Sequence, residues 1–491
     1  MTPTDTIPDR SRWIALVVLC VGALMIVLDA TVVNVALPSI QADLGFSQAG
    51  LAWVVNAYLI AFGGRLLLAG RLGDLISRRG IFLAGLGVFT VASLACGASQ
   101  SQAMLVGARF VQGVGGAMTS AVVLGMIVTM FPDPREQAKA IGVYSFVASA
   151  GGSIGLLAGG VLTQALDWHW IFFVNLPIGI VTAVLALRLL EPDRGAGFAG
   201  GADLPGALLI TTALMLLVYP IVKPAAEAGW GAPRTLELGA VAIALLAAFV
   251  AREATAATPL VPLRIFRSRA VAGANAIQAV TVAGMFGMFF MGALYLQRIL
   301  GYDPLHIGLA FLPTTIVMGG LSLLYAEKLI TRFGARRTLV PGLGLVLAGL
   351  LLLARAPVDG SYVTDLLPVM LLVGTGVALC FPALMTLAMS GSTPEDAGLA
   401  SGLVNTTVQV GGALGLAVLA TLAASETGAR RAAGEPVAQA LNGGYHLAYE
   451  IGAGLLLVAI AIALTPLRPE RAASRREPAR LHGAEPTCEA A

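Results

Sequence analysis

The chain consists of long apolar stretches separated by short polar segments. An α-helix of about 20 apolar residues crosses the roughly 30 Å hydrocarbon core of a bilayer. The pattern predicts an all-α integral membrane protein, and an even number of spans places both termini on one side. The fourteen predicted spans are residues 13–37, 50–70, 80–99, 102–130, 138–163, 170–190, 204–222, 235–251, 271–297, 305–326, 338–356, 363–388, 397–423 and 445–466.

The composition agrees with a chain that lies mostly in lipid. Hydrophobic residues make up 57% of the 491 residues and charged residues only 12%, whereas soluble domains carry roughly 25% charged residues. The composition argues against a soluble enzyme, because a water-exposed surface needs many more charges. The net charge of +3 and the short, scattered basic clusters argue against a nucleic-acid partner.

Lysine and arginine are unevenly distributed between the two sets of loops. Twenty-two of the 30 basic residues fall on the side of the termini, six fall in the opposite loops, and Arg65 and Arg109 lie within spans. Cytoplasmic loops of membrane proteins carry the excess of basic residues. We therefore expect both termini to be cytoplasmic.

A weak internal repeat divides the chain. The loop at 70–79 resembles the loop at 327–336, with Leu72 in register with Leu329 and Arg79 in register with Arg336. Repeated helical halves are the architecture in which many transporters place a binding site near the bilayer midplane. The predicted organisation is a cytoplasmic tail at 1–12, a six-helix half at 13–190, an inserted two-helix linker at 191–252, a second six-helix half at 253–467 and a disordered cytoplasmic tail at 468–491.

Several motifs resemble those of the fourteen-helix drug:proton antiporters of the major facilitator superfamily. They are LDATVVNVALP at 28–38, GRLGDLISRR at 70–79, RFVQGVGG at 109–116, WHWIFFVNLPIG at 168–179, LGYDP at 300–304 and ASGLVN at 400–405. The resemblance covers nearly the whole chain, which has Ser77, His169 and Leu156 where the family usually has Gly, Arg and Pro.

The resemblance implies a fold and a function. The fold would be two six-helix halves related by a pseudo-two-fold axis, with two extra central helices. The function would be efflux of amphiphilic drugs or antibiotics from the cell across the cytoplasmic membrane by alternating access, with the proton gradient as energy source and without a cofactor.

Asp29 is the candidate proton-coupling residue. It is a carboxylate well inside a span of the first half, where a charge costs several kcal/mol unless it is paired, hydrated or protonated. Burial favours the neutral acid and a cationic neighbour favours the carboxylate, so a change of surroundings can load and release a proton. The alternative role is an interhelical hydrogen bond that only fixes packing.

Arg109 is the expected partner of Asp29. Counted at 1.5 Å per residue from the outer ends of their spans, both residues lie roughly 10 to 13 Å deep on antiparallel helices. Gln112, Gly113 and Gly116 follow on the same helical face and would suit a hydrated cavity. Alternatively, Arg109 bonds backbone carbonyls and is structural.

Other polar and polarizable residues within spans are candidates for the substrate cavity. Polarizable Met and flat Phe side chains can repack around varied lipophilic guests, although ordinary packing explains them equally well. Arg65 would either contact an anionic group or extend its side chain to the lipid headgroups, which we favour. The cavity candidates are Asn34, Arg65, Gln112, Asn275, Gln278, Met285, Phe289, Asn405 and Gln409.

Two further groups are assigned to conformational change and packing. Gly70, Asp74, Arg78 and Arg79 resemble the superfamily's latch between halves, although the basic pair also serves to keep this loop inside. Glycines at 151, 155 and 159 recur every four residues and would allow close approach of helices. Nucleotide binding at these glycines is disfavoured because no strand precedes them.

The leading function is therefore proton-coupled export of lipophilic small molecules by a monomer surrounded by membrane lipids. A dedicated exporter of one endogenous metabolite or antibiotic is the alternative within transport. A membrane-embedded enzyme or sensor is disfavoured, because no catalytic constellation or sizeable cytoplasmic domain is present. His306 and His446 offer no metal-ligand pairing, so no metal site is predicted.

Overall fold

A computed structural model describes residues 9–465, apart from 194, 196, 198–200, 202, 224, 226–228 and 391–396. In this part of the chain all regular secondary structure is helical. The predicted C-terminal tail at 468–491 and residues 1–8 of the predicted N-terminal tail lie outside the described residues.

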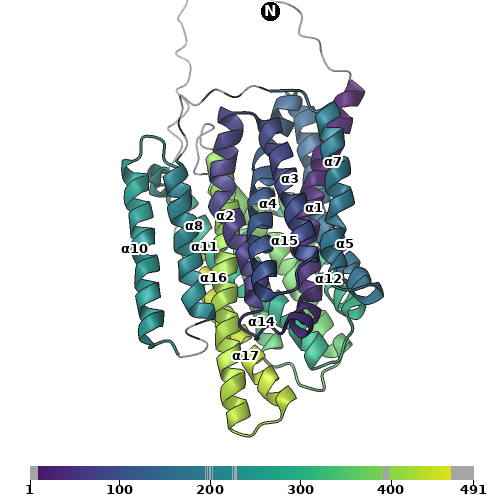
Figure 1. Cartoon of the computed structure of the whole chain (residues 1–491), viewed down its shortest axis with the longest axis vertical. Coiled ribbons are helices and arrows are strands. Elements are labelled where there is room, and N and C mark those ends of the chain that lie inside the picture. The colour runs from purple at the N-terminus through teal and green to yellow at the C-terminus, as the bar shows by residue number, and fades with distance from the viewer. Residues whose placement is uncertain are drawn as a thin grey trace, which may run out of the picture.

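The helices follow the predicted spans closely. We call α1 to α7 the N-terminal half and α11 to α17 the C-terminal half, with α8 and α10 between them (Figure 1). The N-terminal half contains α1 (Asp9–Leu44), α2 (Ala52–Leu75), α3 (Arg78–Gly97), α4 (Gln102–Met130), α5 (Pro134–Ala165), α6 (Trp170–Phe173) and α7 (Asn175–Leu189). The rest contains α8 (Leu204–Val222), α10 (Pro233–Thr255), the short η2 (Leu263–Arg267), α11 (Arg269–Arg298), α12 (Pro304–Leu321), the π-turn η3 (Ser322–Ala326), α13 (Glu327–Phe333), α14 (Ala335–Leu353), the π-turn η4 (Tyr362–Leu366), α15 (Leu367–Ser390), α16 (Ala397–Ala432) and α17 (Val437–Leu464).

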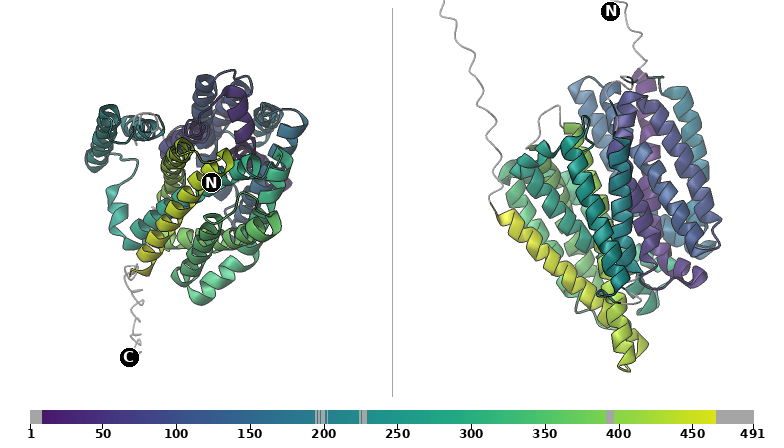
Figure 2. Two further views of the ribbon diagram at one scale, coloured as in Figure 1. Left: turned by 90° about the horizontal axis from the view of Figure 1, so that it is seen from below. Right: turned by 60° about the vertical axis from the view of Figure 1, so that its left-hand side comes forward.

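Thirteen helices of the described chain are long and apolar enough to cross a membrane. The predicted span at 138–163 corresponds to α5, of which the stretch Ile154–Ala165 is found as a shorter apolar helix. The fold is thus a multi-pass helical membrane protein, and the count of fourteen stays a prediction. Figure 2 shows that α1 begins and α17 ends on the same side of the bundle.

The helices α16 and α17 extend beyond their predicted spans of 397–423 and 445–466. The additional turns are polar and form a hairpin that projects from the bundle (Figure 1). Arg430 donates to Glu426 across one helical turn, with Nε 2.7 Å from Oε1. Hydropathy locates only the part of a helix that lies in lipid, so it could not detect this extension.

The internal repeat has a structural counterpart. The Arg79 guanidinium donates to the Leu187 carbonyl, at the end of α7, over 2.6 Å. Arg336 donates to the Ala463 carbonyl, at the end of α17, over 2.7 Å. In each half an arginine in the first turn of the third span thus binds carbonyls that the last turn of the sixth span leaves unpaired.

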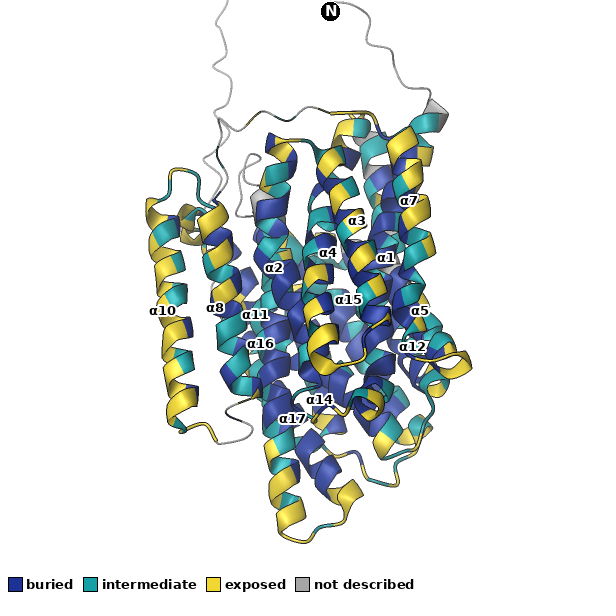
Figure 3. Ribbon diagram, in the orientation of Figure 1, coloured by how far each residue is buried: buried dark blue, intermediate teal, exposed yellow. Residues whose placement is uncertain are grey.

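The helices α8 and α10 stand at one edge of the bundle. Figure 1 places α8 between α10 and the rest of the molecule, and α8 packs on both α2 and α16. Figure 3 shows that α10 is exposed along most of its length. Its outward residues are nevertheless apolar, as Leu236 and Ile243 illustrate with 60% and 63% exposure, so this surface faces lipid rather than water.

The predicted glycines of α5 lie against α1. A Cβ atom on Gly151 would come within 3.0 Å of Leu24, and one on Gly159 within 2.9 Å of the Val32 carbonyl oxygen. At Gly155 a Cβ would overlap the Thr31 hydroxyl. The missing side chains therefore allow the two helices to approach closely.

We expect Gly155→Ala to destabilise the protein and Gly152→Ala to leave it nearly unchanged. The added methyl group at 155 would meet the Thr31 hydroxyl and the Leu28 carbonyl, which lies on the backbone of α1. Such overpacking costs about 1–3 kcal/mol. At Gly152 a Cβ would meet nothing within 4 Å. Thermal unfolding of the purified variants measures the difference, and equal midpoints would contradict a packing role for Gly155.

Candidate functional site

Asp29 lies in a fully buried polar cluster inside the N-terminal half. Its Oδ2 accepts a hydrogen bond from Nη1 of Arg109 at 2.6 Å, and both side chains are only 1% exposed. Its Oδ1 accepts from the Gln112 amide at 2.7 Å and from the Asn175 amide at 3.1 Å. The structure thus brings together Asp29 and Arg109, which were predicted to pair because they lie at equal depth in the membrane. It also surrounds the carboxylate with three hydrogen-bond donors.

Arg109 has further partners that do not depend on Asp29. Its Nε donates to the Val54 backbone carbonyl of α2 at 3.0 Å, and Nη1 also donates to the side-chain oxygen Oε1 of Gln112 at 2.6 Å. The guanidinium carbon lies 4.4 Å from the centre of the Tyr58 ring, a geometry that favours a cation. Arg109 therefore keeps hydrogen bonds and an aromatic face if Asp29 becomes neutral.

Small residues of α4 create the space for this cluster. A Cβ on Gly113 would strike the Tyr58 carbonyl, and one on Gly116 would lie 3.0 Å from the Tyr58 hydroxyl. Glycine at both positions lets α4 approach α2, so that Arg109 can reach the Val54 carbonyl. The motif at 109–116 thus supplies both the polar side chains and the room that they need.

Three members of the cluster were missed by the sequence analysis. Asn175 begins α7 and is fully buried, Ser93 of α3 accepts from Gln112 at 2.8 Å, and Tyr58 packs on Arg109. A lone Asn within the apolar stretch 170–190 was a detectable signal, because an amide in a span needs a partner. Ser93 and Tyr58 have no comparable signal in the sequence.

The cavity candidates of α11 fall into two groups. Gln278, Met285 and Phe289 share one helical face, since seven and eleven residues correspond to nearly whole turns. Gln278 is 1% exposed, and within the described part of the chain neither the oxygen nor the nitrogen of its side-chain amide has a hydrogen-bond partner. Asn275, by contrast, donates to the Val271 carbonyl and accepts from Thr407 at 2.9 Å, so its amide is already used to join α11 to α16.

The remaining cavity candidates are dispersed. Asn34 is half-buried and donates to the Ala30 carbonyl of its own helix at 3.2 Å. Arg65 is half-buried on α2, with its Nε buried and without a hydrogen-bond partner. Gln409 lies where α16 meets α2, because its Cβ would be 2.9 Å from a Cβ on Gly63, and Asn405 is exposed.

The predicted latch residues make their described contacts within the N-terminal half. Asp74 pairs with Arg78 at 2.9 Å, and Arg78 also donates to the Gly125 carbonyl of α4 at 3.1 Å. Arg79 reaches α7 as described above, and Gly70 lies near Ala121 of α4. The latch loop therefore binds its own half tightly in this arrangement.

Asp193, which the sequence analysis did not single out, completes this loop. It accepts from the Ser77 hydroxyl at 2.5 Å and from the backbone amides of Arg78 and Arg79 at 2.7 and 3.1 Å. Partial burial opposes ionisation, but these hydrogen bonds prevail and lower the pKa of Asp193. Ser77, which differs from the usual family residue, also caps α3 by accepting from the Gly80 amide.

The two halves touch on the side opposite to the termini. The Arg298 guanidinium, at the end of α11, donates to the Gln41 side chain of α1 over 2.5 Å. Nearby, a Cβ on Gly160 of α5 would lie 2.8 Å from the backbone of Pro304 and Leu305. On the side opposite to the termini, the two halves are therefore in contact with each other.

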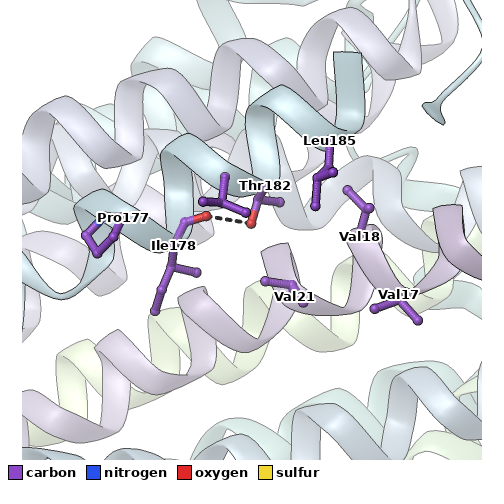
Figure 4. A pocket seen from close by; sticks show the side chains of 8 residues that line it. Val17, Val18, Val21, Pro177, Ile178, Thr182 and Leu185 are labelled. Atoms are coloured by element: carbon purple, nitrogen blue, oxygen red, sulfur yellow. Dashed lines mark hydrogen bonds between the residues drawn. The ribbon is translucent and has the colours of Figure 1, made fainter. Parts of the chain in front are cut away.

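A groove of about 380 Å³ lies outside this site, between α1 and α7 (Figure 4). It is lined by Val17, Val18, Val21, Pro177, Ile178, Val181, Thr182 and Leu185. Its one polar side chain is the Thr182 hydroxyl, which already donates a hydrogen bond to the Ile178 carbonyl at 2.6 Å. Val17 and Val181 are more than half exposed, so the groove belongs to the apolar outer surface. Among the described residues no group of three metal-ligating side chains is found.

Comparisons with known proteins identify relatives over almost the full length. A family model described as the Major Facilitator Superfamily matches residues 19–416. The puromycin resistance protein pur8 of Streptomyces alboniger is 40% identical over 95% of this chain and 93% of its own length. The cephamycin export protein CmcT of Amycolatopsis lactamdurans is 38% identical over 94% and 93%. The lincomycin resistance protein of Streptomyces lincolnensis is 36% identical, again over 94% and 93%.

A solved structure supports the fold. A bacterial homolog to the human lysosomal transporter Spinster, in an inward-facing and unoccupied conformation, matches with a TM-score of 0.66. The two proteins are 17% identical, and the match covers 93% of this chain and 97% of the other. At this identity the likeness concerns the arrangement of helices alone.

Proposed function

The chain belongs to the major facilitator superfamily, and we propose that it exports amphiphilic antibiotics or drugs across the cytoplasmic membrane in exchange for protons. Its relatives named above are antibiotic resistance and export proteins. The two halves would alternate in opening, and the excess of basic residues on the side of the termini supports a cytoplasmic location for that side. Protons, lipophilic substrates and membrane lipids are its proposed partners, and it acts as a monomer.

The observation on which proton coupling rests is the Asp29–Arg109 pair. A carboxylate buried to 1% exposure depends on its donors, so loss of the Arg109 contact favours protonation and its return favours release. Arg109 keeps Val54, Gln112 and Tyr58 as partners in both states. The pair can therefore separate and rejoin without leaving a buried cation unpartnered.

Substrate would contact the face of α11 that carries Gln278, Met285 and Phe289. The Gln278 amide is buried without a partner, and a buried amide is costly unless some group bonds to it. A substrate with a hydroxyl, amine or carbonyl group meets that need, while Met and Phe accommodate its apolar part. Gly70, Asp74, Arg78 and Arg79 would serve as the latch that forms or breaks as the halves move.

A dedicated exporter of one antibiotic is the second candidate. It is favoured by relatives whose names each give a single compound, puromycin, cephamycin and lincomycin. Both candidates share the proposed proton site and differ only in how many substrates the α11 face accepts.

Expression in a strain that lacks its own efflux pumps tests the proposal. We expect the inhibitory concentration of several unrelated amphiphilic antibiotics to rise at least about fourfold, and a protonophore to abolish the active efflux of a fluorescent substrate. A rise for one compound alone would favour the dedicated exporter. Unchanged sensitivity throughout the panel, with the protein present in the membrane, would contradict export of such compounds.

A further inference from the structure

Two buried carboxylates meet where α8 begins and α10 ends, on the side of the termini. Asp203 is the N-cap of α8 and Glu253 lies in the last turn of α10, and each residue is 3% exposed. Around them Leu68, Ala207 and Leu260 form a small apolar cluster. This pair belongs to the inserted helices and not to the Asp29 cluster.

Each carboxylate has one satisfied and one unsatisfied oxygen. Oδ1 of Asp203 accepts from Nε of Arg252 at 2.7 Å and from the Gly206 amide at 2.9 Å. Oε2 of Glu253 accepts from the Val261 amide at 2.8 Å. The other two oxygens, Oδ2 of Asp203 and Oε1 of Glu253, are buried and have no hydrogen-bond partner among the described residues.

The two unsatisfied oxygens face the same space beside Gly206. A Cβ atom on this glycine would overlap Oδ2 of Asp203 and lie 3.0 Å from Oε1 of Glu253. Any larger residue would fill this space between the two oxygens. The absence of a side chain at 206 thus leaves room for the two carboxyl groups to share a small ligand.

The two buried acids have one basic group directly beside them. The charged groups that act most on Glu253 are Asp203 and Arg252. Two buried carboxylates in one site cannot both remain ionised without a large cost, and sharing a proton is the usual solution. A proton between the two unsatisfied oxygens would supply the missing charge and the missing hydrogen bond together.

We propose that Asp203 and Glu253 bind one proton between them, and that this proton fastens the inserted helix pair to the C-terminal half. With the proton bound, Glu253 donates to Asp203 while still accepting from Val261, which precedes η2 and α11. When the proton leaves, the two carboxylates repel each other and Glu253 releases the Val261 amide. This proton site is separate from Asp29 and does not depend on the proposed export function.

The other charged groups on the neighbouring elements are arginines and one acid that is held in an ion pair. The connecting residues 256–262 contain no ionisable side chain. On α2, Arg71 donates to the Gly201 carbonyl at 3.3 Å, and Asp74 pairs with Arg78. On η2 the charged residues are Arg264 and Arg267. Arginines remain cationic throughout the accessible pH range, so a pH-dependent change at Val261 would report the carboxyl pair.

Infrared spectroscopy of the full chain in lipid nanodiscs tests for the shared proton. We expect the wild type to show a buried carboxylic-acid carbonyl band that disappears as pH rises. The band should be missing from Glu253→Gln and Asp203→Asn and unchanged in Glu237→Gln, which alters an exposed acid of the same helix. Identical bands in the wild type and in Glu253→Gln would overturn the proposal.

Hydrogen exchange of residues 256–262 provides a second readout. After correction for intrinsic rates, exchange of the Val261 amide in the wild type should rise about tenfold per pH unit while the pair is losing its proton, and should level off once the proton is gone. Glu253→Gln should keep it protected at every pH, because its amide can donate to Asp203 while its carbonyl accepts from Val261. Protection that depends on sodium, with choline as control, and not on pH would show a cation site instead and overturn the proposal.

Discussion

Asp29→Asn is expected to abolish transport driven by a pH gradient while leaving substrate binding and folding largely intact. Asparagine keeps the shape of the side chain and one acceptor oxygen, which can face either Arg109 or the Gln112 amide, but it cannot take up a proton. Inside-out vesicles with an imposed pH gradient measure the loss, and substrate counterflow without a gradient measures what remains. We expect gradient-driven uptake to fall to the level of empty vesicles.

Asp43→Asn is the matched control on the same helix. Asp43 is exposed near the end of α1, where its Oδ2 accepts from the Trp168 indole at 2.9 Å, and asparagine can replace it as an acceptor. This variant should transport like the wild type. If Asp29→Asn retained full gradient-driven uptake, proton coupling would have to lie elsewhere in the chain.

Arg109→Ala is expected to slow export near neutral pH, with partial recovery in alkaline medium. Removal of the guanidinium leaves a buried Asp29 with only the amides of Gln112 and Asn175 as donors. The variant would then keep a proton on Asp29 that the wild type releases. The pH profile of export in vesicles measures this effect, and a uniform loss at every pH would contradict it.

Measurements of thermal stability distinguish a changed protonation of Asp29 from a general loss of the fold. Removal of one partner of a buried ion pair costs about 3–5 kcal/mol, because the remaining group must either stay charged without its partner or become neutral. The double variant Asp29→Asn with Arg109→Ala should therefore be more stable than Arg109→Ala alone. Thermal unfolding of the purified proteins gives the comparison, and an additive loss in the double variant would contradict pairing.

The position of Asp29 and Arg109 could be predicted because depth in a membrane is a one-dimensional quantity. Span ends are visible in the hydropathy, and a helix rises by a fixed 1.5 Å per residue, so equal depth follows from counting. Gln112 was expected beside Arg109 because both lie on one helical face, but the cluster members on other helices could not be predicted in this way. Asn175, Ser93 and Tyr58 come from three other helices, and their approach depends on how each helix is rotated.

The cavity candidates illustrate the same limit. Asn275 and Gln278 lie within one turn of α11, yet one amide is bonded to Thr407 and the other has no partner. Lipid and protein core are equally apolar, so a membrane helix does not show in its sequence which face is buried. The sequence therefore gives the depth of a single polar residue along a span, but it does not show whether that residue faces lipid, a cavity or another helix.

The sequence by itself determined the helical membrane architecture, the uneven distribution of basic residues and the depth of the candidate proton site. Each of these follows from a property that accumulates along the chain, such as apolar length or charge. Only the tertiary structure decided that Asp193 binds the α2–α3 loop and that Asp203 meets Glu253. Asp193 is joined to Ser77 by a hydrogen bond, and the Asp203 and Glu253 carboxyl groups lie on either side of the space beside Gly206. Both arrangements involve residues distant in sequence, and no periodic pattern specifies them.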